Sequence, residues 1–187
     1  DPSLMGVMMS PFALTPGFQG PAQPTGTQKE VDPDLGLEVG PFMMAVINTK
    51  NVHRSNLLQG HAYGTDFVYD EMSVVAPGSS TEFTDLGGAG GPQPGEGPSK
   101  EEREAGFYDL VFIGVDKDGG QVRGAVYGDK DPGYGSTSKI IAESAICLVK
   151  DCPEVPGGIW VPGAAMGQRL IDRLNARAGL TFSEETV

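Results

Sequence analysis

The stretch Asp131–Lys139 reads DPGYGSTSK and leads directly into an apolar segment at residues 140–149. Glycines flank Tyr134 on both sides, so the backbone there can turn tightly and approach another group closely. Ser136 or Thr137 is expected to cap a helix whose apolar residues recur at helical spacing. The free N–H groups of such a helix start suit an anion or a polar substrate head, but the same pattern also starts an ordinary buried helix.

The segments around this stretch predict an α+β fold. Helices are expected at residues 42–58, 99–105 and 164–178, strands at 65–75, 107–115, 121–127 and 180–182, and a hairpin turn at 116–120. Ser99, followed three residues later by Glu102, is typical of a capping box. We expect a mostly antiparallel sheet with helices packed on one face and long Pro/Gly-rich loops. No strand leads into Gly-x-Gly-x-x-Gly and a helix, so we expect no Rossmann unit within this chain.

Length and composition predict one domain with an extended arm. The chain has 187 residues, 28 Gly and 15 Pro, and 39% of its residues are hydrophobic. Six prolines fall within residues 1–40, which we interpret as an extended Pro-rich arm or an interdomain connection. Residues 41–187 form the predicted α+β domain, with a mobile loop at 76–99. Glycines at 87–91 lack the strand, helix and lysine of a nucleotide loop.

The charge and the cysteines exclude several classes of function. A formal net charge of −12 repels nucleic-acid backbones, so we expect no nucleic-acid partner. No apolar run is long enough for a transmembrane segment, and the first residues lack the basic start of a signal peptide. The two cysteines and two histidines are too scattered for a metal site, and two reduced thiols in a cytoplasmic protein are expected. A start without Met suggests a fragment.

The second half of the predicted helix 42–58 is unusually polar. Asn48 lies on one helical face with Asn51 and Ser55, and such a face can hydrogen-bond a carbonyl or a carboxylate. A solvated helix end explains the same pattern. His53 and Tyr134 are candidate catalytic residues, although a lone histidine is more often a packing residue.

The outward face of the predicted last helix and the start of the helix after Tyr134 carry charged residues. On the last helix, outward positions are expected for Gln168, Arg169, Asp172 and Arg173. Lys139 lies in a first helical turn, where a cation opposes the helix dipole, and its pairing with Glu143 has the weaker orientation for an ion pair. A bound anion would relieve that opposition.

Several long segments together resemble one enzyme family. They are residues 41–56, 66–71, 95–99, 131–148 and 157–167. In this order they resemble the C-terminal half of the saccharopine dehydrogenase-like oxidoreductases, in particular the branch of trans-acting enoyl reductases of lipid and polyketide synthesis. The matches extend from about residue 1 to residue 182.

The resemblance implies an NAD(P)-dependent oxidoreductase. Its N-terminal Rossmann domain would bind NAD(P) outside this chain. The present chain would be the substrate-side, homodimer-forming domain, inactive alone. The implied substrate is lipid-type, polyketide-type or amino-acid-derived. Implied substrate-binding residues are Asn48, Arg54, Asn56, Tyr134 and Lys139, with no cofactor-binding residue and no metal in this chain. The alternative is a noncatalytic lipid- or protein-binding module.

Overall fold

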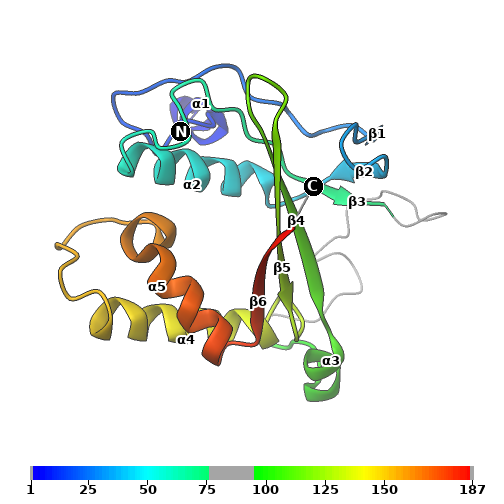
Figure 1. The fold of residues 1–187 in the computed structure, drawn as a ribbon, viewed down its shortest axis with the longest axis vertical. Helices are drawn as coiled ribbons and strands as arrows, with labels where there is room; N and C mark the ends of the chain where they lie inside the picture. Colours follow the sequence, from blue (N-terminus) through cyan, green and yellow to red (C-terminus); the bar gives the residue numbers. More distant parts are fainter. Residues whose placement is uncertain (1, 76–94, 186–187) are drawn as a thin grey trace. The chain divides into compact units, whose positions relative to one another are not determined.

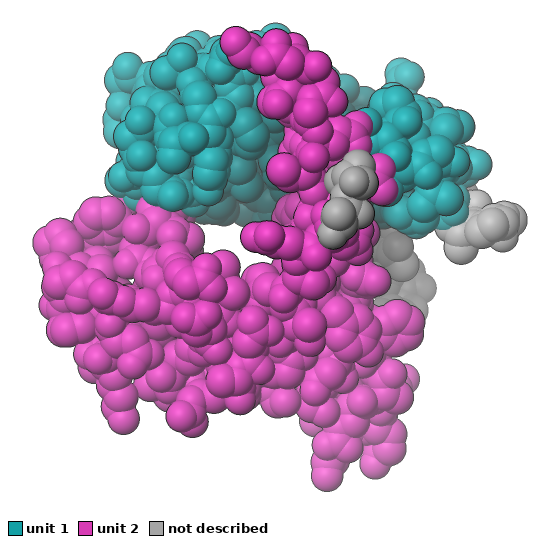
Figure 2. Space-filling view, viewed as in Figure 1, with its two compact units in different colours: residues 1–86 teal, residues 87–187 magenta. Residues whose placement is uncertain are grey.

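The chain consists of two compact units, residues 1–86 and 87–187. Residues 2–75 and 95–185 are described in the computed structural model (Figure 1), and Figure 2 colours the two units separately. Each unit contains its own three-stranded antiparallel sheet. The predicted α+β class is therefore confirmed, with the strands divided between two sheets. The predicted division at residue 40, with residues 1–40 as an arm or connection, stays a prediction. Residues 76–94 of the predicted mobile loop lie outside the described residues.

The first unit contains more regular structure near its start than expected. Its elements are α1 (Pro2–Met9), β1 (Glu30–Val31), β2 (Glu38–Pro41), α2 (Ala45–Leu58) and β3 (Met72–Val74), and its sheet has the order β1-β2-β3. The segment predicted as an extended Pro-rich arm or connection contains regular elements, because α1, β1 and most of β2 lie in residues 1–40.

The predicted strand at 65–75 was too long. Only β3, at its end, pairs with another strand. Gln23 instead bonds the preceding backbone, since its amide nitrogen donates to the Phe67 carbonyl (3.3 Å) and its amide oxygen accepts from the Tyr69 N–H (2.9 Å). A glutamine side chain therefore takes the place that a neighbouring strand would occupy.

The second unit follows the predicted order closely. Its elements are α3 (Lys100–Ala105), β4 (Tyr108–Val115), β5 (Gln121–Gly128), α4 (Gly135–Lys150), α5 (Pro162–Arg177) and β6 (Leu180–Glu185), and its sheet has the order β4-β5-β6. The capping box is confirmed, because Ser99 and Glu102 each accept a hydrogen bond from the other's backbone N–H. The hairpin turn is confirmed too, with Asp116 accepting from the N–H groups of Asp118 and Gly120.

Helices α4 and α5 of the second unit pack on β5 and β6. One apolar cluster joins Leu174, Ala178 and Leu180 with Val126, Ile140, Leu170 and Phe182. A second cluster contains Cys147, Cys152 and Met166 and lies where α4 ends and α5 begins. Both cysteines are buried free thiols. Within α5, Gly167 has φ 49° and ψ −131°, a conformation that only glycine adopts without strain, so the helix is kinked there.

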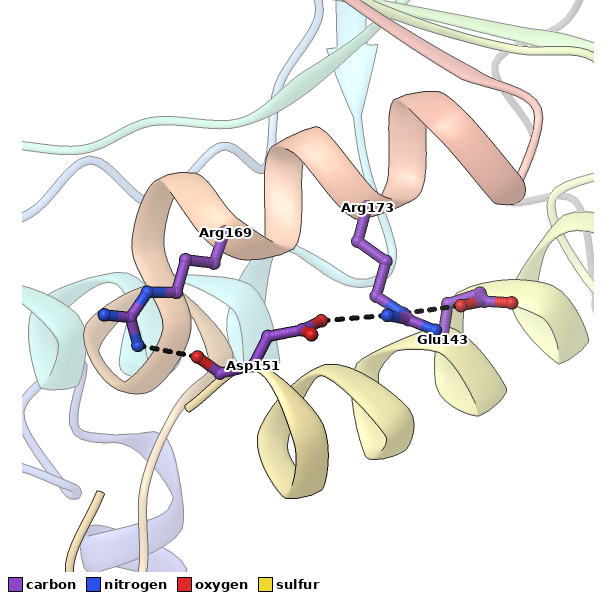
Figure 3. A network of polar contacts seen from close by, with 4 residues as sticks. All are labelled: Glu143, Asp151, Arg169 and Arg173. Atoms are coloured by element: carbon purple, nitrogen blue, oxygen red, sulfur yellow. Dashed lines mark hydrogen bonds and ion pairs between the residues drawn. The ribbon is translucent and has the colours of Figure 1, made fainter. Parts of the chain in front are cut away.

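An ion-pair network joins α5 to the end of α4 (Figure 3). The Arg173 guanidinium donates to the Glu143 carboxylate (2.6 Å) and to the Asp151 carboxylate (2.8 Å), and only 14% of its side chain is exposed. Arg169 donates to the Asp151 carbonyl (2.8 Å) and pairs with Glu154. Arg169 is exposed, as expected for an outward position. The outward expectation was wrong for Arg173, because helical periodicity does not reveal that Glu143 and Asp151 supply acidic partners for it.

Candidate functional site

The predicted polar face of α2 is engaged by the protein itself. The Asn48 amide donates to the Glu71 carboxylate (3.0 Å), and the Asn51 amide donates to the Ile47 carbonyl of its own helix (3.1 Å). The Arg54 guanidinium donates to the Leu14 carbonyl (3.2 Å). These contacts give Asn48 and Arg54 structural partners, and their predicted roles in substrate binding stay predictions.

Asn56 connects the end of α2 to the loop that follows. Its side chain is only 2% exposed. Its amide nitrogen donates to the Gly64 carbonyl (2.8 Å), and its amide oxygen accepts from the Tyr63 N–H (2.9 Å). Both functional atoms are thus used to close the loop, which favours a structural role over the predicted role in substrate binding.

His53 lies in an aromatic cluster of the first unit. The imidazole is 2% exposed, and its ring centroid is 4.5 Å from that of Phe12 and 5.7 Å from that of Phe67. Burial lowers the pKa of His53, so the ring is neutral near pH 7. Its Nε2 atom is buried, and residues 2–75 and 95–185 offer it no hydrogen-bond partner. A general base must reach the proton that it removes, and at 2% exposure His53 would reach a ligand only if the cluster opened.

Two residues beside this helix were not singled out by the sequence. Glu71 accepts the hydrogen bond from Asn48, and it also approaches the Tyr69 hydroxyl. Burial raises the pKa of Tyr69 above its ordinary value, and the neighbouring Glu71 carboxylate raises it further. Tyr69 therefore remains a protonated hydrogen-bond donor at any physiological pH. The sequence around Glu71 gave no signal of its contact with Asn48, because the two residues lie 23 positions apart in the chain.

The start of α4 is capped by Asp131. One carboxylate oxygen accepts from the N–H groups of Gly133 and Tyr134 (both 3.0 Å), and the other accepts from that of Gly135 (2.5 Å). Partial burial raises the pKa of this carboxyl, but the three N–H donors and the charge of Arg103 outweigh burial and hold it below the ordinary value. The Asp131 carboxylate therefore occupies the position at the start of α4 where the sequence predicted that an anion could bind.

The expected cap by Ser136 or Thr137 was wrong for a specific reason. Ser136 is fully buried within α4, and its hydroxyl shares a hydrogen bond with the Tyr108 hydroxyl (2.9 Å) on β4. The Thr137 hydroxyl donates to the Pro132 carbonyl (2.6 Å). Ser136 thus joins the helix to the sheet, while Asp131 satisfies the helix start.

Tyr134 and Lys139 line one hollow of the second unit. Tyr134 is 57% exposed, and Lys139 is half-buried one turn further along α4. The expected Lys139–Glu143 pair does not form, because Glu143 bonds to Arg173 instead. The predicted site residues therefore fall into two groups, with Asn48, His53, Arg54 and Asn56 on α2 of the first unit and Tyr134 and Lys139 in the second.

Two negative findings apply to the described residues alone. None of their helices has both the length and the apolar character needed to cross a bilayer. Residues 2–75 and 95–185 also contain no group of three or more His, Cys, Asp or Glu side chains that could hold a metal ion.

Comparison with known proteins identifies relatives along nearly the whole chain. A Mycobacterium tuberculosis protein provisionally named a trans-acting enoyl reductase is 30% identical over 97% of this chain and 51% of its own length. The trans-acting enoyl reductases of Mycobacterium ulcerans (31% identical) and Mycobacterium bovis (30% identical) each match 93% of this chain and 50% of their own length. The chain thus spans about half the length of these curated relatives.

Two other comparisons are negative. No family model matches the chain, and no solved structure matches it. Membership of the wider saccharopine dehydrogenase-like family stays a prediction. The expected resemblance to the trans-acting enoyl reductases is confirmed over nearly the whole of this chain.

Proposed function

We propose that this chain is the substrate-side part of an enoyl-reductase-type oxidoreductase. The observation that carries the proposal is the match to proteins named trans-acting enoyl reductases over 93–97% of this chain. An enoyl group has a carbon–carbon double bond conjugated to a carbonyl. Its reduction adds a hydride to one carbon and a proton to the other. The proposed substrate is lipid-type, polyketide-type or amino-acid-derived and carries such an enoyl group.

The hydride would come from NAD(P)H held mainly by a further domain. Two observations support a further domain: the relatives are about twice as long as the matched region, and the sheet of the second unit carries exposed apolar side chains. Val111, Phe112, Val115 and Val122 are each about half exposed or more. The strand register places Val111 and Val115 on one face of the β4–β5 hairpin and Phe112 and Val122 on the other, and we propose that a further domain covers part of this surface. The chain alone is therefore proposed to be inactive.

Tyr134 is the proposed proton donor of this chain. Its phenol is 57% exposed, and it lies beside the cationic Lys139 in one hollow. A phenol can deliver a proton to a carbon that becomes basic as hydride arrives. The buried His53 lacks such exposure. A noncatalytic binding module remains the alternative, but no specific observation favours it over the enzyme.

The intact protein tests this proposal in two steps. We expect NADPH to bind it with enhanced nicotinamide fluorescence, and we expect NADPH to be consumed with an α,β-unsaturated acyl thioester. Tyr134→Phe should lower kcat at least tenfold without lowering Tm. Tyr127→Phe is a matched control because Tyr127 is similarly exposed on β5. Absence of nicotinamide binding would contradict the proposed enzyme function. An unchanged kcat with a lowered Tm in Tyr134→Phe would give Tyr134 a structural role.

A further inference from the structure

Cationic side chains gather in one hollow of the second unit, beside the starts of α3 and α4. The hollow has a volume of about 480 Å³. Four cations, Lys100, Arg103, Lys130 and Lys139, line it together with Glu104 and Tyr134. The whole chain has only 13 Lys and Arg against 25 Asp and Glu. This concentration of positive charge in a strongly acidic chain is unlike a solvated surface of mixed charge.

The backbone holds these cations in place. The Asp131 N–H donates to the Arg103 carbonyl (3.1 Å), which ties the loop before α4 to α3. A Cβ atom at Gly135 would lie 2.9 Å from the Arg103 carbonyl oxygen and 3.1 Å from Lys130 Cβ. Glycine at this position therefore allows α3, Lys130 and the start of α4 to approach one another closely.

The cations of the hollow have few acidic partners. Within the described part of the chain, no ion pair joins Lys130 or Lys139 to a carboxylate, and the Glu143 partner expected for Lys139 is bonded to Arg173. The Lys100–Glu104 pair is long, at 3.9 Å. Asp131 lies close to Arg103, but its oxygens are directed at three N–H groups of the α4 start. Positive charge therefore exceeds negative charge in the hollow.

This arrangement costs stability unless an anion binds. Like charges held close together repel one another. Lys139 is the fifth residue of α4, in the second turn and not in the first turn that the sequence predicted. Asp131 already satisfies the N–H groups at the start of α4, so the attraction for a ligand comes from the side chains and not from the helix end. A hollow lined by several cations favours a ligand that carries more than one negative charge and several oxygen atoms. Arg and Lys are the side chains that usually bind a phosphoryl group.

We propose that this hollow binds the phosphoryl group of a small organic phosphate. The exposed ring of Tyr134 forms one wall and offers a surface for the organic part of the ligand. The phosphoryl group belongs either to a dinucleotide or to another phosphorylated molecule. The inference rests on this hollow and not on the proposed reaction, so either can fail without the other.

Calorimetric titration of the 187-residue chain with inorganic pyrophosphate tests the site. We expect saturable binding that weakens as salt is added, because exposed charges are screened. The double variant Lys130→Met/Lys139→Met should bind at least tenfold more weakly. It should keep its Tm, since the two substitutions remove like charges that repel one another in the hollow. Lys150→Met is the matched control, because Lys150 lies at the far end of α4, about 16 Å along the helix from Lys139.

Competition then identifies the source of the phosphoryl group. Displacement of pyrophosphate by NADP⁺ and not by phenyl phosphate assigns a dinucleotide, and displacement by phenyl phosphate assigns another organic phosphate. Pyrophosphate binding that neither compound displaces would overturn the assignment to an organic phosphate. An absence of saturable binding, or equal weakening by Lys150→Met, would overturn the site itself. None of these measurements depends on NADPH turnover, so they remain separate from the test of the enzyme.

Discussion

The two units have different interiors. In the first unit three of the buried side chains are polar, Thr15, His53 and Asn56, and they lie among aromatic rings and backbone groups. In the second unit the buried residues are mostly apolar and join α4 and α5 to the sheet, as Cys147, Leu174 and Leu180 do. Hydrogen bonds have strict geometry, whereas apolar burial depends on area and packing. The first unit should therefore be more sensitive to loss of a single polar atom, and the second to loss of a helix start or a packed side chain.

Asn56→Ala should have the largest effect. It leaves the Gly64 carbonyl and the Tyr63 N–H without partners in a closed loop. Each buried group left unsatisfied costs about 1–3 kcal/mol, so we expect the free energy of unfolding in urea to fall by about 2–3 kcal/mol.

Asn51→Ala is the matched control for that variant. Asn51 lies on the same helix, is exposed, and bonds only to the Ile47 carbonyl of its own helix. Because alanine favours a helix, its unfolding free energy should stay within about 0.5 kcal/mol of the wild-type value. If Asn56→Ala were equally harmless and instead weakened substrate binding by the intact protein, Asn56 would return to its predicted role in the substrate site.

Asp131→Ala should have an intermediate effect in the second unit. It removes the acceptor of three N–H groups at the start of α4. Loss of a helix cap costs typically about 1 kcal/mol, measured again by urea unfolding at pH 7. Because the folded-state pKa of Asp131 is lowered, this stabilisation is present above the ordinary carboxyl pKa and is lost as the pH falls through the lowered value.

The control for Asp131→Ala is Asp118→Ala in the exposed turn between β4 and β5. We expect less than half the effect there. Equal losses from the two variants would mean that the cap contributes no more than an ordinary surface aspartate. Asp131→Asn distinguishes charge from hydrogen bonding, because an amide keeps one acceptor oxygen where the carboxylate uses both.

Local signals in the sequence predicted local structure well. The capping box at Ser99 and the turn at Asp116 depend on residues within four positions of each other, and both were predicted. The cap of α4 was assigned to the wrong residue, because Ser136 and Asp131 are both suitable caps. Tyr108, 28 residues earlier, decides between them by bonding Ser136.

Two residues of the cationic hollow were predicted as substrate-binding residues, and that role stays a prediction. Tyr134 and Lys139 were identified from the stretch that opens α4, but Lys100, Arg103 and Lys130 were not. Those three come from α3 and from the beginning of the β5–α4 connection, and no local pattern brings them together. The partners of Arg173 were also missed, because no local pattern brings them together. Glu143 lies on α4 and Asp151 directly after it, far from Arg173 in sequence.

The smallest expected effect is a pH dependence of the first unit that arises from His53. Burial lowers the folded-state pKa of this imidazole below 6.5, so the unfolded chain takes up a proton more readily than the folded chain. Stability from this residue is fully present above pH 6.5 and is lost as the pH falls toward the lowered value. Linkage limits the loss between pH 7.5 and 5.5 to about 1 kcal/mol.

His53→Gln removes this titration and should flatten the pH dependence over that interval, whatever its effect on stability at pH 7.5. The interval is informative because ordinary carboxylates titrate below it and the chain has only two histidines. His61→Gln is the control, and it should keep the slope of the wild type. A slope that survives His53→Gln and disappears in His61→Gln would move the acid sensitivity to the loop after α2. A slope unchanged in both would show that the aromatic cluster around His53 opens to water before it titrates.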